Sequence, residues 1–451
     1  MRASASLAII LALTMLPGLG LAQEETAKPW EDWQPPEVQM PEPNAWEIYL
    51  LAGELEDEIY RRLRDEAGLP AEEERPGPPP ALPEAVAVPG VEQGATALRL
   101  DMSQRSLEPE TLAQLIREYA PVFSALEAAI AGEAQMPPLR TQQEIEEAFP
   151  RFASIRQFAR MFAARSVYHM QNEHALSAAL DGIAAMRIGA DIGTGAPMIT
   201  GLVQVACAAI GEAHLREAIP RLTGDEARIA ANALRAAMAE LATFADVVEG
   251  EGVFSRVYFI RTSAPEMLTR AEIEALAEDQ QLPEGTVAFS AEDTWEALDA
   301  YHEDVLAEAR KPWWQREPIE EPQNPLVATL VQAYERAGLR FAYMDARVRV
   351  TLAALAAQAY HADVGHYPAT LDALVPGYLS EVPADPFTDA PLRAAVRDPV
   401  SRAHPGAQRE PTGAGVLTIY SVGYDQDDDG GVDVGNRIEE DGDIALTLRG
   451  E

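Results

Sequence analysis

Residues 359 to 368, Ala-Tyr-His-Ala-Asp-Val-Gly-His-Tyr-Pro, mark the point at which a long predicted helix ends and a small C-terminal unit begins. The helix starts at about Asn324, and Tyr367-Pro368 should end it because proline has no backbone N–H to donate. Further on, residues 417 to 422 alternate as a β-strand does. The sequence therefore predicts a mainly α protein, an antiparallel helical array followed, over residues 323–451, by the long helix and a small α+β domain.

The region from 109 to 322 is predicted to be a helical domain. Thr141–Glu144 and Thr223–Glu226 have the spacing of capping boxes, each opening a helical run. Each run carries one apolar stripe at i, i+3, i+4 spacing. The stripes consist of Phe152, Ile155, Ala159, Phe162 and Ala163, and of Ile229, Ala230, Ala233, Leu234, Ala237, Met238, Leu241 and Phe244.

One segment of this region has the length of a membrane span. Residues 192 to 211 carry no formal charge. They are rich in Gly, Ala and Thr and poor in Leu and Phe, unlike a lipid-facing helix. We therefore expect a buried core helix here.

The N-terminus has the features of a secretory signal. Arg2 precedes a compact apolar run from Leu7 to Leu16, and Gly20-Leu21-Ala22 offers small residues for cleavage. The run is shorter than the roughly 20 residues that span a bilayer. Residues 1–22 are thus predicted to be a signal peptide, which leaves an extracytoplasmic protein, periplasmic or secreted, with no integral membrane span after cleavage.

Residues 23–108 are predicted to be acidic, Pro-rich linkers that flank a single helix over about 45–67. Asn44 is the expected N-cap of that helix. The sequence does not decide whether the helix packs on the rest of the protein or remains tethered.

The composition limits the classes of partner. The chain has a formal net charge of −38, and Lys28 and Lys311 are its only lysines. Such a charge repels nucleic acid and attracts cations. Cys207 is the only cysteine, which excludes an intramolecular disulfide.

An acidic loop near the C-terminus carries the only site chemistry that the sequence can name. Asp425, Asp427 and Asp429 alternate and are followed by Gly430, as in the first half of a calcium loop. A complete EF-hand would have Glu at position 12, where this chain has Asn436. An EF-hand is therefore not expected, and the loop is either a different calcium site or a solvated acidic turn.

The order of motifs in this region resembles the globular head of the major pseudopilin of type II secretion systems, whose acidic loop binds calcium. Similar tails occur on uncharacterised exported bacterial proteins. The matching motifs are Asp385-Pro386-Phe387, Ser421-Val422-Gly423 with Asp425, and Asp441-Gly442-Asp443-Ile444. The resemblance implies Asp425, Asp441 and Asp443 as calcium ligands, whereas Asp427 and Asp429 are candidates from their spacing alone.

One departure from the family changes the expected function. A pseudopilin begins with a prepilin peptidase site and a membrane-spanning helix, and this chain has neither. The helix before its head carries Asp345, Arg347 and Arg349, which a bilayer would not accept. We therefore do not expect this protein to polymerise as a pseudopilin does.

Searches for catalytic motifs identify no catalytic and no cofactor-binding residues. There is no Gly-x-Ser-x-Gly elbow, no Walker loop and no zinc-type cysteine pair. His169, Glu173 and His174 superficially resemble a metallopeptidase motif, but on one continuous helix the two histidines would lie about 140° apart. His361, Asp363 and His366 are interpreted as exposed polar residues.

Three hypotheses of function follow. The leading one is an exported, non-enzymatic structural or interaction protein with a calcium-binding, pseudopilin-like tail and a protein partner in the cell envelope. The second is an exported hydrolase whose acid and base are carboxylates of the helical domain; a carboxylate pair in a shared cleft, one with a raised pKa, would favour it. The third is an accessory protein of a type II secretion or pilus system.

Overall fold

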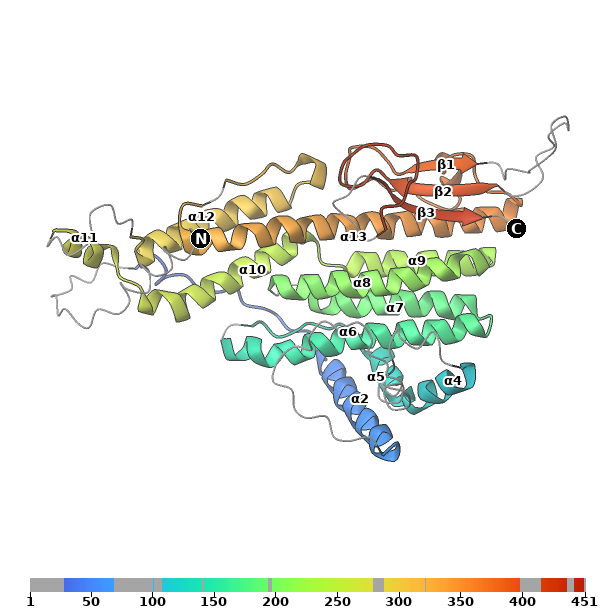
Figure 1. Ribbon diagram of the computed structural model, residues 1–451, viewed down its shortest axis with the longest axis horizontal. Coiled ribbons are helices and arrows are strands. Elements are labelled where there is room, and N and C mark those ends of the chain that lie inside the picture. The colour runs from blue at the N-terminus through green and yellow to red at the C-terminus, as the bar shows by residue number, and fades with distance from the viewer. Residues whose placement is uncertain are drawn as a thin grey trace.

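The computed structural model describes residues 28–68, 100, 108–139, 142–193, 197–278, 288–320, 322–397, 415–435 and 442–449. The protein is mainly helical, with a small three-stranded antiparallel sheet near its C-terminus. Figure 1 shows the helices stacked side by side, with the sheet lying on the outermost long helix. The predicted signal peptide, residues 1–22, lies outside the described residues.

The helices and strands are as follows. The helices are α2 (Trp46–Glu66), α4 (Pro109–Glu118), α5 (Ala120–Ile130), α6 (Gln142–Gln171), α7 (Ala175–Gly193), α8 (Met198–Ala218), α9 (Gly224–Glu240), α10 (Phe244–Tyr258), α11 (Arg270–Glu278), α12 (Ala291–Ala309) and α13 (Pro325–Val364). The sheet has the order β1 (Arg393–Arg397), β2 (Val416–Ser421) and β3 (Ile444–Arg449).

Side-chain caps set several helix starts, and the capping box at Thr223 was predicted. Thr223 and Glu226 form a complete capping box at α9, and Asn324 Oδ1 accepts the N–H of Leu326 at the start of α13. Thr243 and Ser290 open α10 and α12 with capping boxes that the sequence analysis did not identify. Thr141 lies outside the described residues.

Two details of the predicted helices were wrong. Helix α13 ends at Val364 rather than at Tyr367-Pro368, because Gly365 takes a left-handed φ of 85° that is open to glycine at no steric cost. Ile229 is 48% exposed, so it lies outside the buried stripe of α9. The stripe of α6 is confirmed, since all five of its residues are buried.

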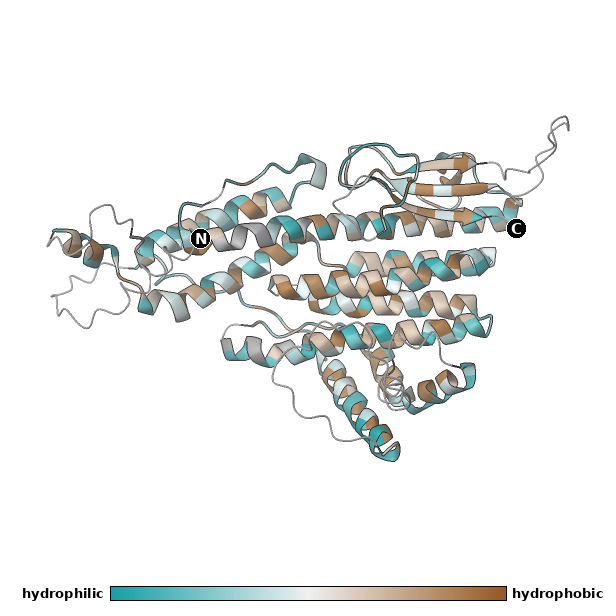
Figure 2. Ribbon diagram, in the orientation of Figure 1, coloured by the Kyte–Doolittle hydropathy of each residue, from teal (hydrophilic) through white to brown (hydrophobic). Residues whose placement is uncertain are grey.

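The charge-free segment is used to pack α7 against α8. A Cβ added to Gly211 would lie 2.1 Å from the carbonyl oxygen of Gly182, so the two backbones meet where neither residue has a side chain. Figure 2 shows apolar residues concentrated along these two helices. Helix α8, with the 3-10 turn after it (Met198–Arg221), is long and apolar enough to cross a membrane, but it is mostly buried inside the protein.

Three apolar clusters form the interior of the described part of the protein. One lies under α2, α4, α5 and α6 and includes Cys207 of α8. The largest cluster takes residues from α7 to α10, α12 and α13 and continues into the sheet through Leu417, Ile419, Leu446 and Leu448. The third joins one side of α13 to the C-terminal module and consists of Leu339, Ala342, Ala346, Phe387, Val422, Val434 and Ile444. The apolar core is therefore continuous between the helices before residue 322 and the long helix with the sheet after it.

The first helix packs on the rest of the protein, a point that the sequence left open. Helix α2, close to its predicted bounds, packs on α5 and α6. Asn44 Oδ1 accepts the N–H groups of Trp46 and Gln135, and Tyr49 Oη donates to Asp191 Oδ2 of α7 at 2.5 Å. This segment is therefore docked, and polar contacts with distant residues fix its position.

A buried charge joins α8 to α13. Glu212 is 1% exposed, and its Oε2 accepts from Nε and Nη2 of Arg347 at 3.0 and 2.5 Å. Its Oε1 accepts from Thr351 at 2.8 Å and from Arg216 at 3.2 Å. Arg216 also donates to the carbonyl of Ala445 in β3, so the same group of residues links both helices to the sheet.

Glu212→Gln should lower the free energy of unfolding by about 3–5 kcal/mol, because it leaves the half-buried guanidinium groups without their counter-charge. Chemical denaturation followed by circular dichroism measures the change. Arg62→Gln is the control, since it breaks only solvent-exposed pairs with Glu118 and Glu66 and should cost much less than Glu212→Gln does. Equal losses in the two variants would contradict the role given to Glu212.

Candidate metal centre

The acidic loop leaves the sheet at the end of β2, and the Asp385-Pro386-Phe387 turn fixes its first residues. Asp385 is buried; its Oδ1 accepts from Ser421 Oγ at 2.7 Å and its Oδ2 from the N–H of Val422 at 2.9 Å. The N–H of Phe387 also donates to Oδ1. The loop therefore begins from a rigid base.

Asp425 brings the start of the loop to its return segment. Its Oδ1 accepts the N–H of Asp427 at 3.1 Å, and its Oδ2 accepts the N–H of Gly442 at 2.8 Å. A Cβ at Gly423, where φ is +74°, would lie 2.7 Å from the carbonyl oxygen of Gly442. Glycine is thus needed here both for the backbone conformation and for the close approach.

Asp443 is the most constrained carboxylate of the loop. It is fully buried, and its Oδ2 accepts the N–H of Gly431 at 2.7 Å, whereas its Oδ1 is buried with no hydrogen-bond partner. Burial raises the pKa of Asp443 to about 6, and the nearby charges of Asp428 and Asp429 act in the same direction. The ionised form of this group therefore lacks a compensating positive charge.

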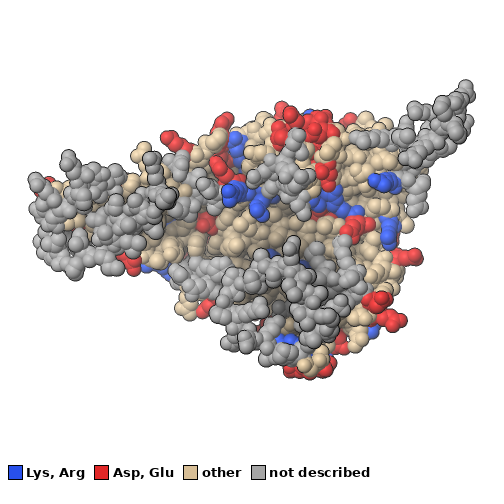
Figure 3. Space-filling model, viewed as in Figure 1, with Lys and Arg blue, Asp and Glu red and all other residues tan. Residues whose placement is uncertain are grey.

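The other candidates differ in their surroundings. Asp427 and Asp429 are exposed, and the backbone N–H of Asp429 bonds to the Asp443 carboxylate. Figure 3 shows a dense group of acidic atoms where this loop lies. Asp441 lies outside the described residues, and among those described no three His, Cys, Asp or Glu side chains are grouped so that they could hold a metal ion.

Asp428 was missed by the sequence analysis. It pairs with Arg393 of β1 at 2.6 Å and accepts from Tyr420 Oη at 3.0 Å. A calcium loop takes side-chain ligands from positions 1, 3 and 5, which are Asp425, Asp427 and Asp429 here. Asp428 is at position 4, so this pattern does not select it. Its partners lie on strands that only the sheet brings to the loop.

The side-chain donors of the loop are carboxylate oxygens, the ligand type that a hard cation such as calcium prefers. Calcium takes carboxylate and carbonyl oxygens, so a site need not contain three side-chain acids. Asp443 Oδ1 is a buried oxygen without a donor, close to two further negative charges. A bound calcium ion would supply the positive charge that this oxygen lacks.

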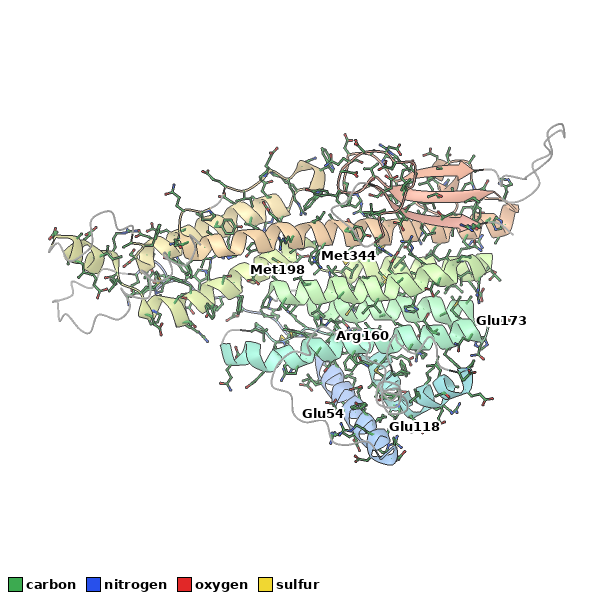
Figure 4. All side chains as sticks on the ribbon, in the orientation of Figure 1. Glu54, Glu118, Arg160, Glu173, Met198 and Met344 are labelled. Atoms are coloured by element: carbon green, nitrogen blue, oxygen red, sulfur yellow. The ribbon has the colours of Figure 1, made fainter. Side chains whose placement is uncertain are left out.

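The histidine pair differs from the expected arrangement. Helix α6 ends at Gln171, and Glu173 takes a φ of 61°, which turns the chain so that the His169 and His174 ring centroids are 6.0 Å apart. Figure 4 labels Glu173 at this end of the helical stack. The prediction that the two rings point apart was wrong, because it assumed one continuous helix.

The surroundings of these histidines nevertheless do not suit a metal. His169 Nε2 lies 3.6 Å from Asp181, whose carboxylate is already held by Arg165 through both Nε and Nη2. Burial lowers the pKa of His169 to about 4, and the charge of Arg165 acts in the same direction. In the other group that contains histidines, His361, Asp363 and His366, the carboxylate of Asp363 is already paired with Arg228.

The chain matches no protein-family model, no curated protein sequence and no solved structure.

Asp443→Asn should change how stability depends on pH when calcium is absent. The folded pKa of Asp443, about 6, lies above its ordinary value, so its contribution to stability is fully present below about pH 4 and is lost as the pH rises through 6. The Asn variant should therefore gain stability relative to wild type between pH 4 and 7, by about 1–3 kcal/mol.

Thermal unfolding of both proteins in chelator-treated buffers at several pH values measures this difference. Asp372→Asn, an exposed aspartate of the same region, serves as the control and should show a constant offset. A constant offset for Asp443→Asn as well would show that the buried carboxylate is not electrostatically penalised.

Proposed function

We propose that this chain is an exported, non-enzymatic structural or interaction protein of the cell envelope whose C-terminal module is stabilised by calcium. The observation that carries the calcium assignment is the buried, unpartnered Oδ1 of Asp443. Folding such an oxygen away from water costs free energy unless a cation or a hydrogen-bond donor meets it. Calcium binding would convert this cost into stability that depends on the calcium concentration outside the cytoplasm.

The arrangement of the tail supports the pseudopilin resemblance. A long helix precedes the Asp385 turn, and an antiparallel strand pair encloses the acidic loop. Asp425 accepts a hydrogen bond from the N–H of Gly442. This contact brings together the two acidic motifs of the resemblance, one with Asp425 and the other with Gly442 and Asp443. Such a module would act as a compact head attached to the helical body.

The same structure argues against assembly in the manner of a pseudopilin. Helix α13 packs against α8, α9, α10 and α12 along with the sheet, so its apolar residues are already used inside one chain. Arg347 pairs with buried Glu212, and Arg349 pairs with Asp345 at 2.7 Å. An interaction protein with a fixed head fits these contacts better than a filament subunit.

A hydrolase is the second candidate, and one observation bears on it. Asp345 and Asp385 line a shared cavity, and burial, with the Asp385 charge adding to it, raises the pKa of Asp345. That combination is the signature expected of an acid–base pair. However, Asp385 accepts three hydrogen bonds from Ser421, Val422 and Phe387, so its oxygens already hold the turn together.

Titration of calcium into the full chain, followed by calorimetry, tests the first proposal. We expect about one ion per chain, with a dissociation constant no weaker than the 10⁻⁴–10⁻³ M typical of roughly comparable extracellular modules. At about 100 times that constant, calcium should stabilise the fold by about 2.7 kcal/mol. Magnesium should bind more weakly, because it demands a smaller and more regular set of ligands.

Variants assign the ligands. Asp443→Asn, and the double variant Asp425→Ala with Asp441→Ala, should lose calcium binding, whereas Asp372→Asn should bind as wild type does. If wild type shows no saturable binding at millimolar calcium, the loop is a solvated acidic turn. Binding that survives in Asp443→Asn would place any calcium site elsewhere.

A further inference from the structure

A cavity of about 740 Å³ lies where the helical body meets the C-terminal module. Its walls come from the α9–α10 connection, the 309–316 connection, one face of α13 and the 384–389 turn. The volume is within the range of pockets that hold small organic ligands. Met344, labelled near the middle of α13 in Figure 4, is one of its lining residues.

Much of the lining is apolar. The wall on α13 has Phe341, Met344 and Val348, which share one face of the helix because they are three, four and seven residues apart. The opposite wall includes Met238, Leu241 and Phe244. A ligand with an apolar body would therefore gain by leaving water here.

Arg316 stands out among the charged lining residues. Its guanidinium lies 4.9 Å from the ring of Phe244 and 5.4 Å from that of Trp313. Nε and Nη2 donate to the carbonyls of Lys311 and Ala309, but Nη1 is buried without an acceptor. Among the described residues no carboxylate forms an ion pair with Arg316 at contact distance, although the charge of Glu308 acts on it from farther away, and Nη1 lacks a hydrogen-bond acceptor.

The backbone makes room for this arrangement. A Cβ at Gly338 of α13 would lie 3.1 Å from Arg316 Nη1 and 3.1 Å from Phe244. A side chain at position 338 would therefore press on the guanidinium and on the ring beside it. Burial lowers the pKa of Arg316 to about 10, which still leaves the group protonated at neutral pH.

The chain has a net charge of −38, but the cavity lining has charges of both signs. Its acids are Asp345, Asp385 and the exposed Asp389, and Lys311 is paired with Glu308 at 2.5 Å. Arg310 and Lys311, one of the two lysines of the chain, also line it. The carboxylate of Asp345 is already paired with Arg349, and that of Asp385 is bonded to its own turn. Arg310 is exposed, so Arg316 is the half-buried lining cation that no ion pair at contact distance neutralises.

We propose that this cavity binds a small organic carboxylate with an apolar chain or ring, and that Arg316 holds the carboxylate. The Arg316 Nη1 would donate to a carboxylate oxygen, and the apolar walls would cover the rest of the ligand. A neutral ligand would leave the buried guanidinium unpaired, so the site should discriminate by charge. This inference does not depend on calcium binding by the acidic loop.

The test compares octanoate with 1-octanol on the full chain, by calorimetric titration in chelator-treated buffer. We expect octanoate to bind about one per chain and at least tenfold more tightly than octanol, since the two differ at the charged end. Absence of saturable binding at millimolar octanoate, or equal affinity for the two compounds, would overturn the proposal. This comparison needs no variant, so it does not depend on the folding of one.

Variants then locate the site. Arg316→Met should weaken octanoate binding at least tenfold and leave octanol binding unchanged, and circular dichroism checks that it folds. Arg340→Met, an exposed arginine of α13 outside the cavity lining, should bind octanoate as wild type does. Unchanged octanoate binding in a folded Arg316→Met variant would place any carboxylate site elsewhere and so refute this assignment.

Discussion

The buried carboxylate of Glu212 is the charge on which the join between the helical body and the C-terminal module depends. Taking a carboxylate out of water costs several kcal/mol, and only well-placed donors repay that cost. Arg347, Thr351 and Arg216 surround it, and Arg216 continues to the backbone of β3 at Ala445. These donors fix the register of α13 against α8, because a slip by one turn would leave the carboxylate unpaired.

That register places the sheet, and with it the acidic loop. Tyr343, one turn before Arg347 on α13, donates to the carbonyl of Gly435, so the helix also contacts the loop. Within the loop, backbone N–H groups donate to both oxygens of Asp425 and to Oδ2 of Asp443, whereas Asp443 Oδ1 is buried without a hydrogen-bond partner. Within the described part of the chain, one buried carboxylate oxygen of the loop thus has neither a hydrogen-bond donor nor a positive charge beside it, and a cation bound there would stabilise it most.

The same join also creates the cavity. Its floor is the face of α13 that neither the sheet nor the neighbouring helices cover completely, and its rim includes the turn held by Asp385. Arg316 enters from the connection between α12 and α13 and contacts the rings of Phe244 and Trp313, whereas the carboxylate charge that acts on it, that of Glu308, forms no ion pair with it. A pocket of this kind exists only because segments more than 140 residues apart meet there.

The sequence by itself determined the local features, because these depend on neighbours along the chain. It predicted the helical class, the buried stripe of α6, the capping box at Thr223, a helix start at about Asn324 and an acidic loop after a strand. It did not find Asp428 or Arg316 as notable charges, since their partners are distant in sequence, and it misplaced His174 by assuming an unbroken helix. Which carboxylate is buried and unpaired, and which arginine lacks a counter-ion, was decided only by tertiary structure, because desolvation depends on what packs around a group and not on its neighbours in the chain.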